Sequence, residues 1–179
     1  NGEGRAKVLL DIERIYNAVA ANPLWDQNRI AVMGGSYGGF MALHSMVNLN
    51  NFVRCGIDVV GISNFVTFLE NTSDYRRDLR RVEYGNERLP EMRKFLQELS
   101  PLTHVEKITR PLLIVQGAND PRVPASESAQ IEAALRKKDI ETWYLLAKDE
   151  GHGFRKQANR TFQFLTTVQF LRRHLLGAD

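Results

Sequence analysis

The chain has 179 residues, which is the size of a single domain. Hydrophobic residues make up 43% and charged residues 25%, and this ordinary balance excludes a disordered tail and a fibrous repeat. The net charge of +3 is too small to require a nucleic acid or a membrane as partner, and no apolar run approaches the roughly 18 residues of a membrane span. The single cysteine, Cys55, excludes an internal disulfide and favours a reducing compartment, so we expect a cytoplasmic protein.

Helices and strands are predicted to alternate along the chain. Residues 5–21 carry apolar side chains at helical spacing, and Asn22-Pro23 predicts the end of this helix because a residue before proline disfavours the α region. Further helices are predicted at 37–49, 126–138 and 159–176, and short apolar strands at 29–34, 55–61, 112–116 and 141–146.

The predicted strands are nearly all apolar, which indicates a parallel sheet buried on both faces. We therefore expect an α/β fold, with a mostly parallel sheet covered by helices on both faces. Residues 62–100 are polar and helical in patches. They are predicted to form a helical insertion that caps a site.

The segment Gly34-Gly35-Ser36-Tyr37-Gly38 contains the pattern G-x-S-x-G between a strand and a helix. This pattern is typical of a sharp turn that holds a nucleophilic serine. The residues two positions before and after the serine are expected to be glycines, because a side chain there would strike the adjacent strand or helix. Ser36 would lie at a helix N-terminus, where the backbone N–H of Tyr37 could serve as the first oxyanion donor. A glycine-rich turn with an ordinary serine is the alternative, and the glycine spacing fits a phosphate-binding loop poorly.

A serine hydroxyl needs a base, and the base needs an orienting carboxylate. Asp120 follows the third predicted strand and His152 follows the fourth, so the chain order is Ser, Asp, His. Asp120 could instead be a turn former before Pro121, and Asp149 and Glu150 are rival carboxylates near His152. The other histidines are interpreted as structural: His44, His104 and His174.

Three segments resemble the prolyl oligopeptidase family of serine peptidases, which includes dipeptidyl peptidases and acylaminoacyl peptidases. The first surrounds Ser36 (VMGGSYGGFM). The second consists of RPLLIVQG, which precedes Asp120, and DPRVP, which begins with it. The third surrounds His152 (EGHGF). The resemblance implies an α/β-hydrolase fold, with Ser36 as nucleophile, His152 as general acid and base, and Asp120 as its orienter. It also implies acyl-enzyme chemistry on peptides or esters without a metal or cofactor.

The family often binds the residue before the scissile bond in an apolar pocket. The resemblance makes Phe65, Phe68 and Val123 candidates for this pocket, with Tyr37 nearby, although packing in a helical core is an equally good interpretation of the aromatic residues. The arginine-rich run at residues 76–81 is interpreted as a solvated helix face rather than a substrate clamp.

The family pattern also includes a β-propeller and several strands before the first helix seen here. Residues 1–179 are therefore expected to be the C-terminal portion of the hydrolase domain, without the loop that normally supplies the second oxyanion donor. Strand 29–34 would then be an exposed apolar edge, through Ile30 and Val32, that pairs with a second copy or a completing chain. Peptide hydrolysis is the leading hypothesis. The alternatives are a carboxylesterase with the same residues and a non-catalytic fragment that associates through its edge strand.

Overall fold

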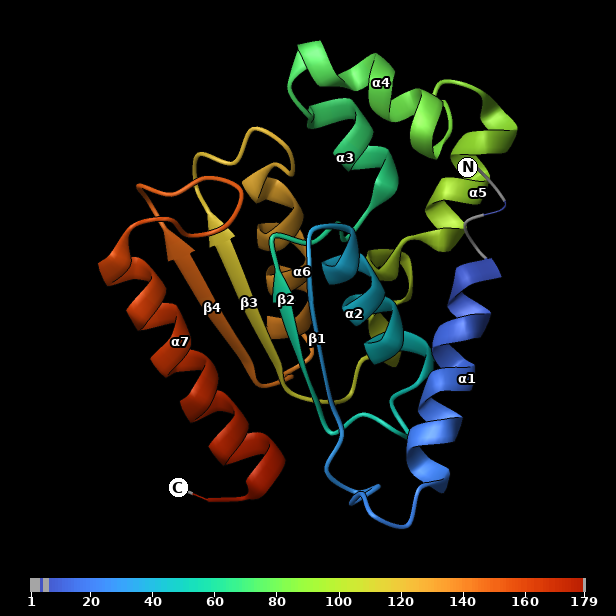
Figure 1. Cartoon of the computed structure of the whole chain (residues 1–179). Coiled ribbons are helices and arrows are strands. Elements are labelled where there is room, and N and C mark those ends of the chain that lie inside the picture. Colours follow the sequence, from blue (N-terminus) through green and yellow to red (C-terminus); the bar gives the residue numbers. More distant parts are fainter. Residues whose placement is uncertain (1–3, 5–6, 179) are drawn as a thin grey trace.

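The computed structural model describes residue 4 and residues 7–178, and within them the chain forms a parallel sheet flanked by helices (Figure 1). The strands are β1 (Ala31–Gly35), β2 (Cys55–Val59), β3 (Leu112–Gly117) and β4 (Thr142–Ala147). The α-helices are α1 (Lys7–Ala21), α2 (Tyr37–Asn48), α3 (Phe65–Asn71), α4 (Asp74–Tyr84), α5 (Pro90–Leu99), α6 (Ala125–Arg136) and α7 (Gln157–Leu171). A 3-10 segment, η2 (Pro101–Lys107), precedes β3, and a π-helical segment, η3 (Arg172–Leu176), follows α7.

Every predicted strand and helix is present, with ends that shift by a few residues. Residues 5 and 6 of the first predicted helix lie outside the described residues. β2 ends at Val59, two residues before its predicted end, because Val60 adopts a φ of 49° that no strand can continue. The insertion at 62–100 forms α3, α4 and α5, which lie beyond the carboxyl ends of the strands, at the top of Figure 1.

The strands pair in the order β1-β2-β3-β4, and all pairs are parallel. Their carboxyl ends therefore share one edge of the sheet, where ligands bind in open α/β sheets. In the register of the sheet, Gly34 lies beside Asp58, and Gly117 lies beside Ala147. This brings the loops after β1, β3 and β4 to the same edge, although they are far apart in the sequence.

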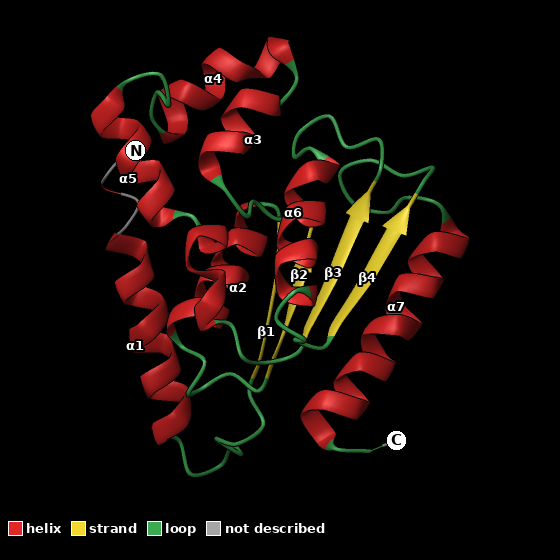
Figure 2. Ribbon diagram, turned by 180° about the vertical axis from the view of Figure 1, so that it is seen from behind, coloured by secondary structure: helices red, strands yellow, loops and turns green. Residues whose placement is uncertain are grey.

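Helices cover both faces of the sheet, as the apolar strands predicted (Figure 2). Successive side chains of β3 alternate between the faces, because side chains of a strand point to opposite sides in turn. Leu112 and Ile114 pack in a cluster with residues of α1, α2 and α6, whereas Leu113 and Val115 pack with Phe170 of α7. The sheet is thus buried between two apolar layers and provides a rigid base for the loops at its carboxyl edge.

The edge strand β1 differs in detail from its prediction. Ile30 and Val32 were expected to be the exposed apolar residues, but both pack against the cluster of α1 and α2. The exposed residue is Met33, at 58%, because it points to the opposite face, towards α7. Met33 and Phe164 of α7 line a surface cavity of about 570 Å³, and among the described residues β1 pairs only with β2.

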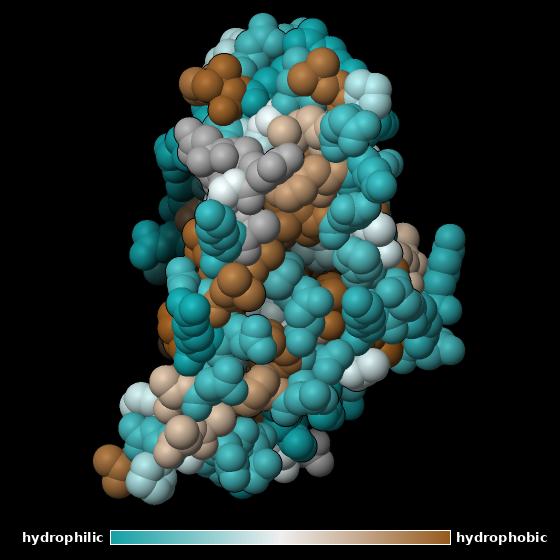
Figure 3. Space-filling model, turned by 90° about the vertical axis from the view of Figure 1, so that its right-hand side faces the viewer, coloured by the Kyte–Doolittle hydropathy of each residue, from teal (hydrophilic) through white to brown (hydrophobic). Residues whose placement is uncertain are grey.

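The face of the molecule that carries α1 and α5 is mainly polar. Figure 3 shows the side of the molecule on the right of Figure 1, where hydrophilic residues dominate and hydrophobic residues form separate patches. In the part of the chain that the structure describes, no helix has both the length and the apolar character needed to cross a membrane.

The arginine-rich run on α4 is not the solvated face that the sequence suggested. Arg80 and Arg81 have side chains that are only 20% and 14% exposed, because they form ion pairs with Glu83 and Glu87. The ion pairs bind α4 to itself and to the turn that follows it. Arg76 is different, because it lines a cavity at the carboxyl edge of the sheet.

Candidate active site

Ser36 sits on a sharp turn between β1 and α2. Its φ of 57° and ψ of −119° are unusual for a residue with a side chain, and such backbone strain is concentrated at functional sites. The turn is held by the Ser36 N–H, which donates to the Val59 carbonyl at 2.8 Å, while the Ser36 carbonyl accepts from Gly39 N at 3.0 Å. These bonds hold Ser36 at the N-terminus of α2, where Tyr37 is the first helical residue.

The glycines around Ser36 have different roles from those predicted. A Cβ at Gly34 would lie 1.9 Å from the Gly38 carbonyl oxygen, so Gly34 must be small, as expected. A Cβ at Gly38 would meet no atom within 4 Å, so the crowding expected at its own side-chain position is absent. The second crowded position is Gly39, where a Cβ would lie 2.3 Å from Asp58 Oδ1 and 2.6 Å from Gly61 Cα.

This contrast gives a matched pair of alanine variants. We expect Gly39→Ala to lower the free energy of unfolding by about 1–3 kcal/mol, because the new methyl group has to displace backbone as well as the Asp58 carboxyl. We expect Gly38→Ala to keep or raise that stability by up to about 1 kcal/mol, because alanine favours helix over glycine. Denaturant unfolding of both variants measures the difference, and equal stabilities would contradict the crowding at Gly39.

Asp120 lies in the loop after β3, and its side chain is completely buried. One carboxylate oxygen accepts from the backbone N–H groups of Arg122 at 2.8 Å and Val123 at 3.1 Å. The other oxygen lies 2.7 Å from His152 Nδ1. Asp120 is therefore both the turn former that its position before Pro121 suggested and a partner of the histidine.

His152 lies in the loop between β4 and α7. Gly151 and Gly153 form an isolated bridge on either side of it, and Gly153 has a φ of 89° that favours glycine. A Cβ at Gly117, the last residue of β3, would lie 2.1 Å from the Gly151 carbonyl oxygen. The loop can therefore approach the end of β3 because Gly117 has no side chain.

Ser36, His152 and Asp120 form one continuous chain of hydrogen bonds. His152 Nε2 lies 3.0 Å from Ser36 Oγ, and Nδ1 lies 2.7 Å from Asp120 Oδ2. A neutral imidazole with its proton on Nδ1 donates to the carboxylate and leaves Nε2 to accept the serine proton. The arrangement can therefore remove a proton from Ser36 while a buried carboxylate stabilises the imidazolium that results.

The rival carboxylates near His152 bind other partners. Asp149 pairs with Lys156 at 2.6 Å. Glu150 accepts from the backbone N–H groups of Arg155 and Lys156, and the first of these bonds lowers the pKa of its carboxyl. This role of Glu150 in shaping the loop that carries His152 was not predicted from the sequence, where Glu150 was only a rival for Asp120.

Two further acids, Asp58 of β2 and Glu127 of α6, are buried. Burial raises the pKa of the Asp58 carboxyl to about 7, in the space between Gly39 and Gly61. Burial also raises the pKa of Glu127, which accepts from Ser63 N at 3.1 Å and from Asn64 N at 2.8 Å and so connects α6 to the start of α3. The sequence feature that could have revealed them is a charged residue among apolar ones, within a predicted strand for Asp58 and on the apolar face of a predicted helix for Glu127.

The pocket candidates are buried in a further apolar cluster, separate from the two on the faces of the sheet and formed largely by residues of α2, α3, α4 and α5. Phe65 is 0% exposed, and Phe68 and Val123 are each 2% exposed. They pack with Phe40 and Tyr84, and Tyr37 lies at the border of the cluster. Their contact with a substrate stays a prediction. The cavity that borders His152 has a volume of about 420 Å³ and is lined by other residues.

The three histidines interpreted as structural lie away from this hydrogen-bond chain. The nearest side-chain or carbonyl partners are Asn48 for His44, the Glu98 carbonyl for His104 and Glu141 for His174. Within residue 4 and residues 7–178, no group of three or more His, Cys, Asp or Glu side chains could hold a metal ion.

A parallel sheet between helical layers, with a strained serine turn and Asp and His loops at its carboxyl edge, defines an α/β hydrolase. Comparison with known proteins identifies the family. The model of the prolyl oligopeptidase family matches residues 4–178, and the chain belongs to this family.

Curated relatives and solved structures agree with this assignment. The chain is 39% identical to dipeptidyl peptidase family member 6 of Caenorhabditis elegans over 99% of its length, and 39% identical to dipeptidyl aminopeptidase BIII of Pseudoxanthomonas mexicana over 93%. It covers 24% and 25% of those proteins. A puromycin-hydrolyzing peptidase of Mycobacterium tuberculosis superimposes with a TM-score of 0.86 at 29% identity, over 96% of this chain and 25% of that one.

Proposed function

We propose that this chain carries the catalytic centre of a serine peptidase that cleaves oligopeptides through an acyl-enzyme on Ser36. The observation that supports this most directly is the hydrogen-bond chain from Ser36 Oγ through His152 to the buried Asp120. Family membership supports the same reaction class. The chain spans about a quarter of the length of the curated relatives, so the substrates of the whole protein are part of the proposal.

The proposed reaction begins when His152 Nε2 accepts the hydroxyl proton and Ser36 Oγ attacks the scissile carbonyl carbon. Asp120 keeps the Nδ1 proton in place and stabilises the imidazolium. The N–H of Tyr37, at the start of α2, donates to the oxyanion. His152 then gives its proton to the leaving amine as the C–N bond breaks, and water hydrolyses the acyl-enzyme through the same base.

The apolar pocket is proposed from Phe65, Phe68 and Val123. These residues are buried and pack in the cluster that Tyr37 borders. In the proposed pocket, a substrate displaces the aromatic ring of Tyr37 and reaches them. The alternative is that they form only a packed core. The two rings closest to Tyr37 are Phe40, with centroids 5.3 Å apart, and Tyr84, at 6.1 Å. A substrate side chain would enter between this aromatic group and Ser36.

A fluorophosphonate probe tests the proposal, because it reacts with an activated serine and leaves ordinary serines unmodified. We expect a single adduct on Ser36 and none on Ser126, an exposed serine of α6. Turnover of peptide p-nitroanilides and p-nitrophenyl esters then distinguishes a peptidase from a carboxylesterase with the same residues. A folded protein without an adduct on Ser36 would favour the non-catalytic alternative, in which the chain associates through the edge of β1.

A further inference from the structure

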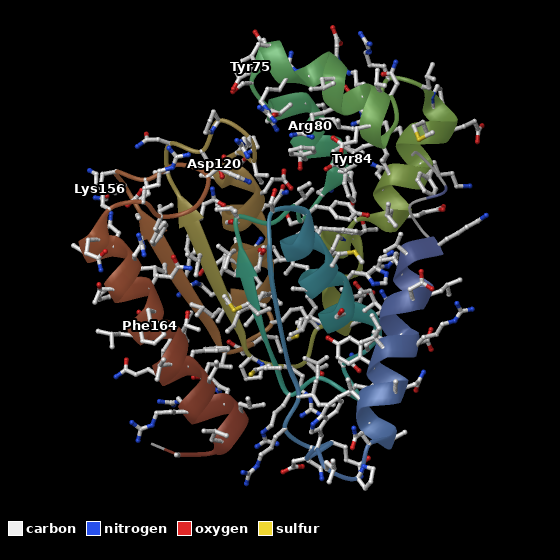
Figure 4. The ribbon with its side chains drawn as sticks, in the orientation of Figure 1. Tyr75, Arg80, Tyr84, Asp120, Lys156 and Phe164 are labelled. Carbon is white, nitrogen blue, oxygen red and sulfur yellow. The ribbon has the colours of Figure 1, made fainter. Side chains whose placement is uncertain are left out.

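The cavity beside His152 is formed by three parts of the chain. They are the start of α4, the loop after Asp120 and the loop that carries His152. Figure 4 labels Tyr75 on α4 above the loop that carries Asp120. The lining residues are Tyr75, Arg76, Pro121, Arg122, Gly151, His152, Gly153 and Arg155. Three of these eight residues are arginines, one from each part of the chain.

These three arginines differ from most of their neighbours because they form no ion pair with the described residues. On the same helix, Arg77 pairs with Asp74, and the two arginines that follow pair with acids as described above. Arg76 instead lies over the ring of Tyr75, with its guanidinium carbon 5.8 Å from the ring centroid. Arg122 and Arg155 contact the nearby acids only through their backbone N–H groups.

The acids near the cavity have other partners. The buried oxygens of Asp120 accept from two backbone N–H groups and from His152. Glu150 accepts from two backbone N–H groups and from Asn159, and Asp149 pairs with Lys156. The positive charge of the three guanidinium groups is therefore not neutralised within the cavity, and it meets the solvent next to the imidazole.

We propose that this cavity binds a carboxylate of the peptide substrate, and this inference rests on the proposed function. A guanidinium group binds a carboxylate through two parallel hydrogen bonds, and several groups from separate elements would fix its position. A carboxylate bound there would hold the scissile bond near Ser36, because His152 borders the same cavity. The group is either the free α-carboxylate of the residue after the scissile bond or an acidic side chain beside that bond.

Matched peptides test the proposal. The first pair ends in a free acid or an amide one residue after the scissile bond, and the second pair carries Glu or Gln beside that bond with an amide end. We expect the protein to prefer the charged member of at least one pair. The pair that shows the preference identifies the source of the carboxylate.

Variants of the cavity connect this preference to the arginines. In Arg122→Gln/Arg155→Gln, we expect the ratio of kcat/KM between the charged and neutral peptides to fall roughly tenfold, as the loss of charged hydrogen bonds implies. The backbone N–H of Arg122 still donates to Asp120 in this variant. Arg160→Gln is the control, because Arg160 is an exposed arginine of α7 that lies outside this cavity, and the ratio should not change.

A binding measurement separates this proposal from the proposed function. Calorimetry on Ser36→Ala protein, with and without the two glutamine substitutions, compares the affinities for the charged and neutral peptides without turnover. Tighter binding of the charged peptide that is lost in the glutamine variant supports the carboxylate site even if no peptide is hydrolysed. Equal binding of both members of both pairs overturns it, whether or not Ser36 is catalytic.

Discussion

Ser36→Ala is expected to abolish peptide turnover, with kcat reduced about a million-fold, as in serine hydrolases whose nucleophile is removed. The physical reason is that Ser36 Oγ forms the covalent bond of the acyl-enzyme. Among the described residues, no other hydroxyl forms a hydrogen bond with His152 Nε2. Steady-state hydrolysis of a peptide p-nitroanilide measures the loss. Ser126→Ala, at an exposed position of α6, is the control and should keep the original rate.

The double variant Ser36→Ala/His152→Ala should be no slower than Ser36→Ala alone. The two groups act as one unit, because the imidazole serves only to move the proton of the serine and of the leaving group. Additive losses would contradict the proposed roles and would mean that His152 contributes through another step. Unfolding curves for each variant show whether a loss of activity reflects loss of the fold.

Asp120→Asn is expected to reduce kcat about ten-thousand-fold while the protein stays folded. The amide can donate to Nδ1, which favours the imidazole tautomer with its proton on Nε2, and that tautomer cannot accept the proton of Ser36. The backbone N–H groups of Arg122 and Val123 can still donate to the side-chain oxygen of asparagine. The loop is therefore expected to keep its shape.

Asp149→Asn is the matched control for this prediction. Asp149 lies closer to His152 in the sequence, but its carboxylate pairs with Lys156 on the surface. We expect less than a tenfold change in kcat for this variant. The opposite outcome, with a large loss for Asp149→Asn and a small one for Asp120→Asn, would mean that Asp149 and not Asp120 orients His152.

The sequence was sufficient for the class of fold and for the family. Apolar runs such as Leu112–Gly117 are typical of strands buried on both faces, and the helices between them favour parallel pairing. The same strands indicated that Ser36, Asp120 and His152 would share one edge of the sheet, because each lies in the turn or loop that follows a predicted strand. These features depend on residue type and local spacing, which the sequence states directly.

Other features depended on contacts between distant residues. The role of Glu150 in shaping the loop of His152 could not be predicted from the sequence. Its hydrogen-bond partners, the backbone N–H groups of Arg155 and Lys156, are fixed by the path of the loop towards α7. The crowding at Gly39 comes from Asp58 and Gly61 on a neighbouring segment, so the G-x-S-x-G pattern pointed to Gly38 instead. The prediction of which apolar residue of β1 is exposed was wrong. Met33 faces α7, and the position of α7 relative to β1 depends on the tertiary structure.

The arginine-rich helix shows the same division most clearly. By itself, the sequence determined that residues 76–81 form part of a charged helix in an insertion near the site. Only the tertiary structure decided that Arg80 and Arg81 are bound to acids, while Arg76 meets Arg122 and Arg155 around the cavity of His152. The reason is that helical periodicity fixes the direction of a side chain relative to its own helix. What that side chain faces is fixed by the packing of α4 over the carboxyl edge of the sheet.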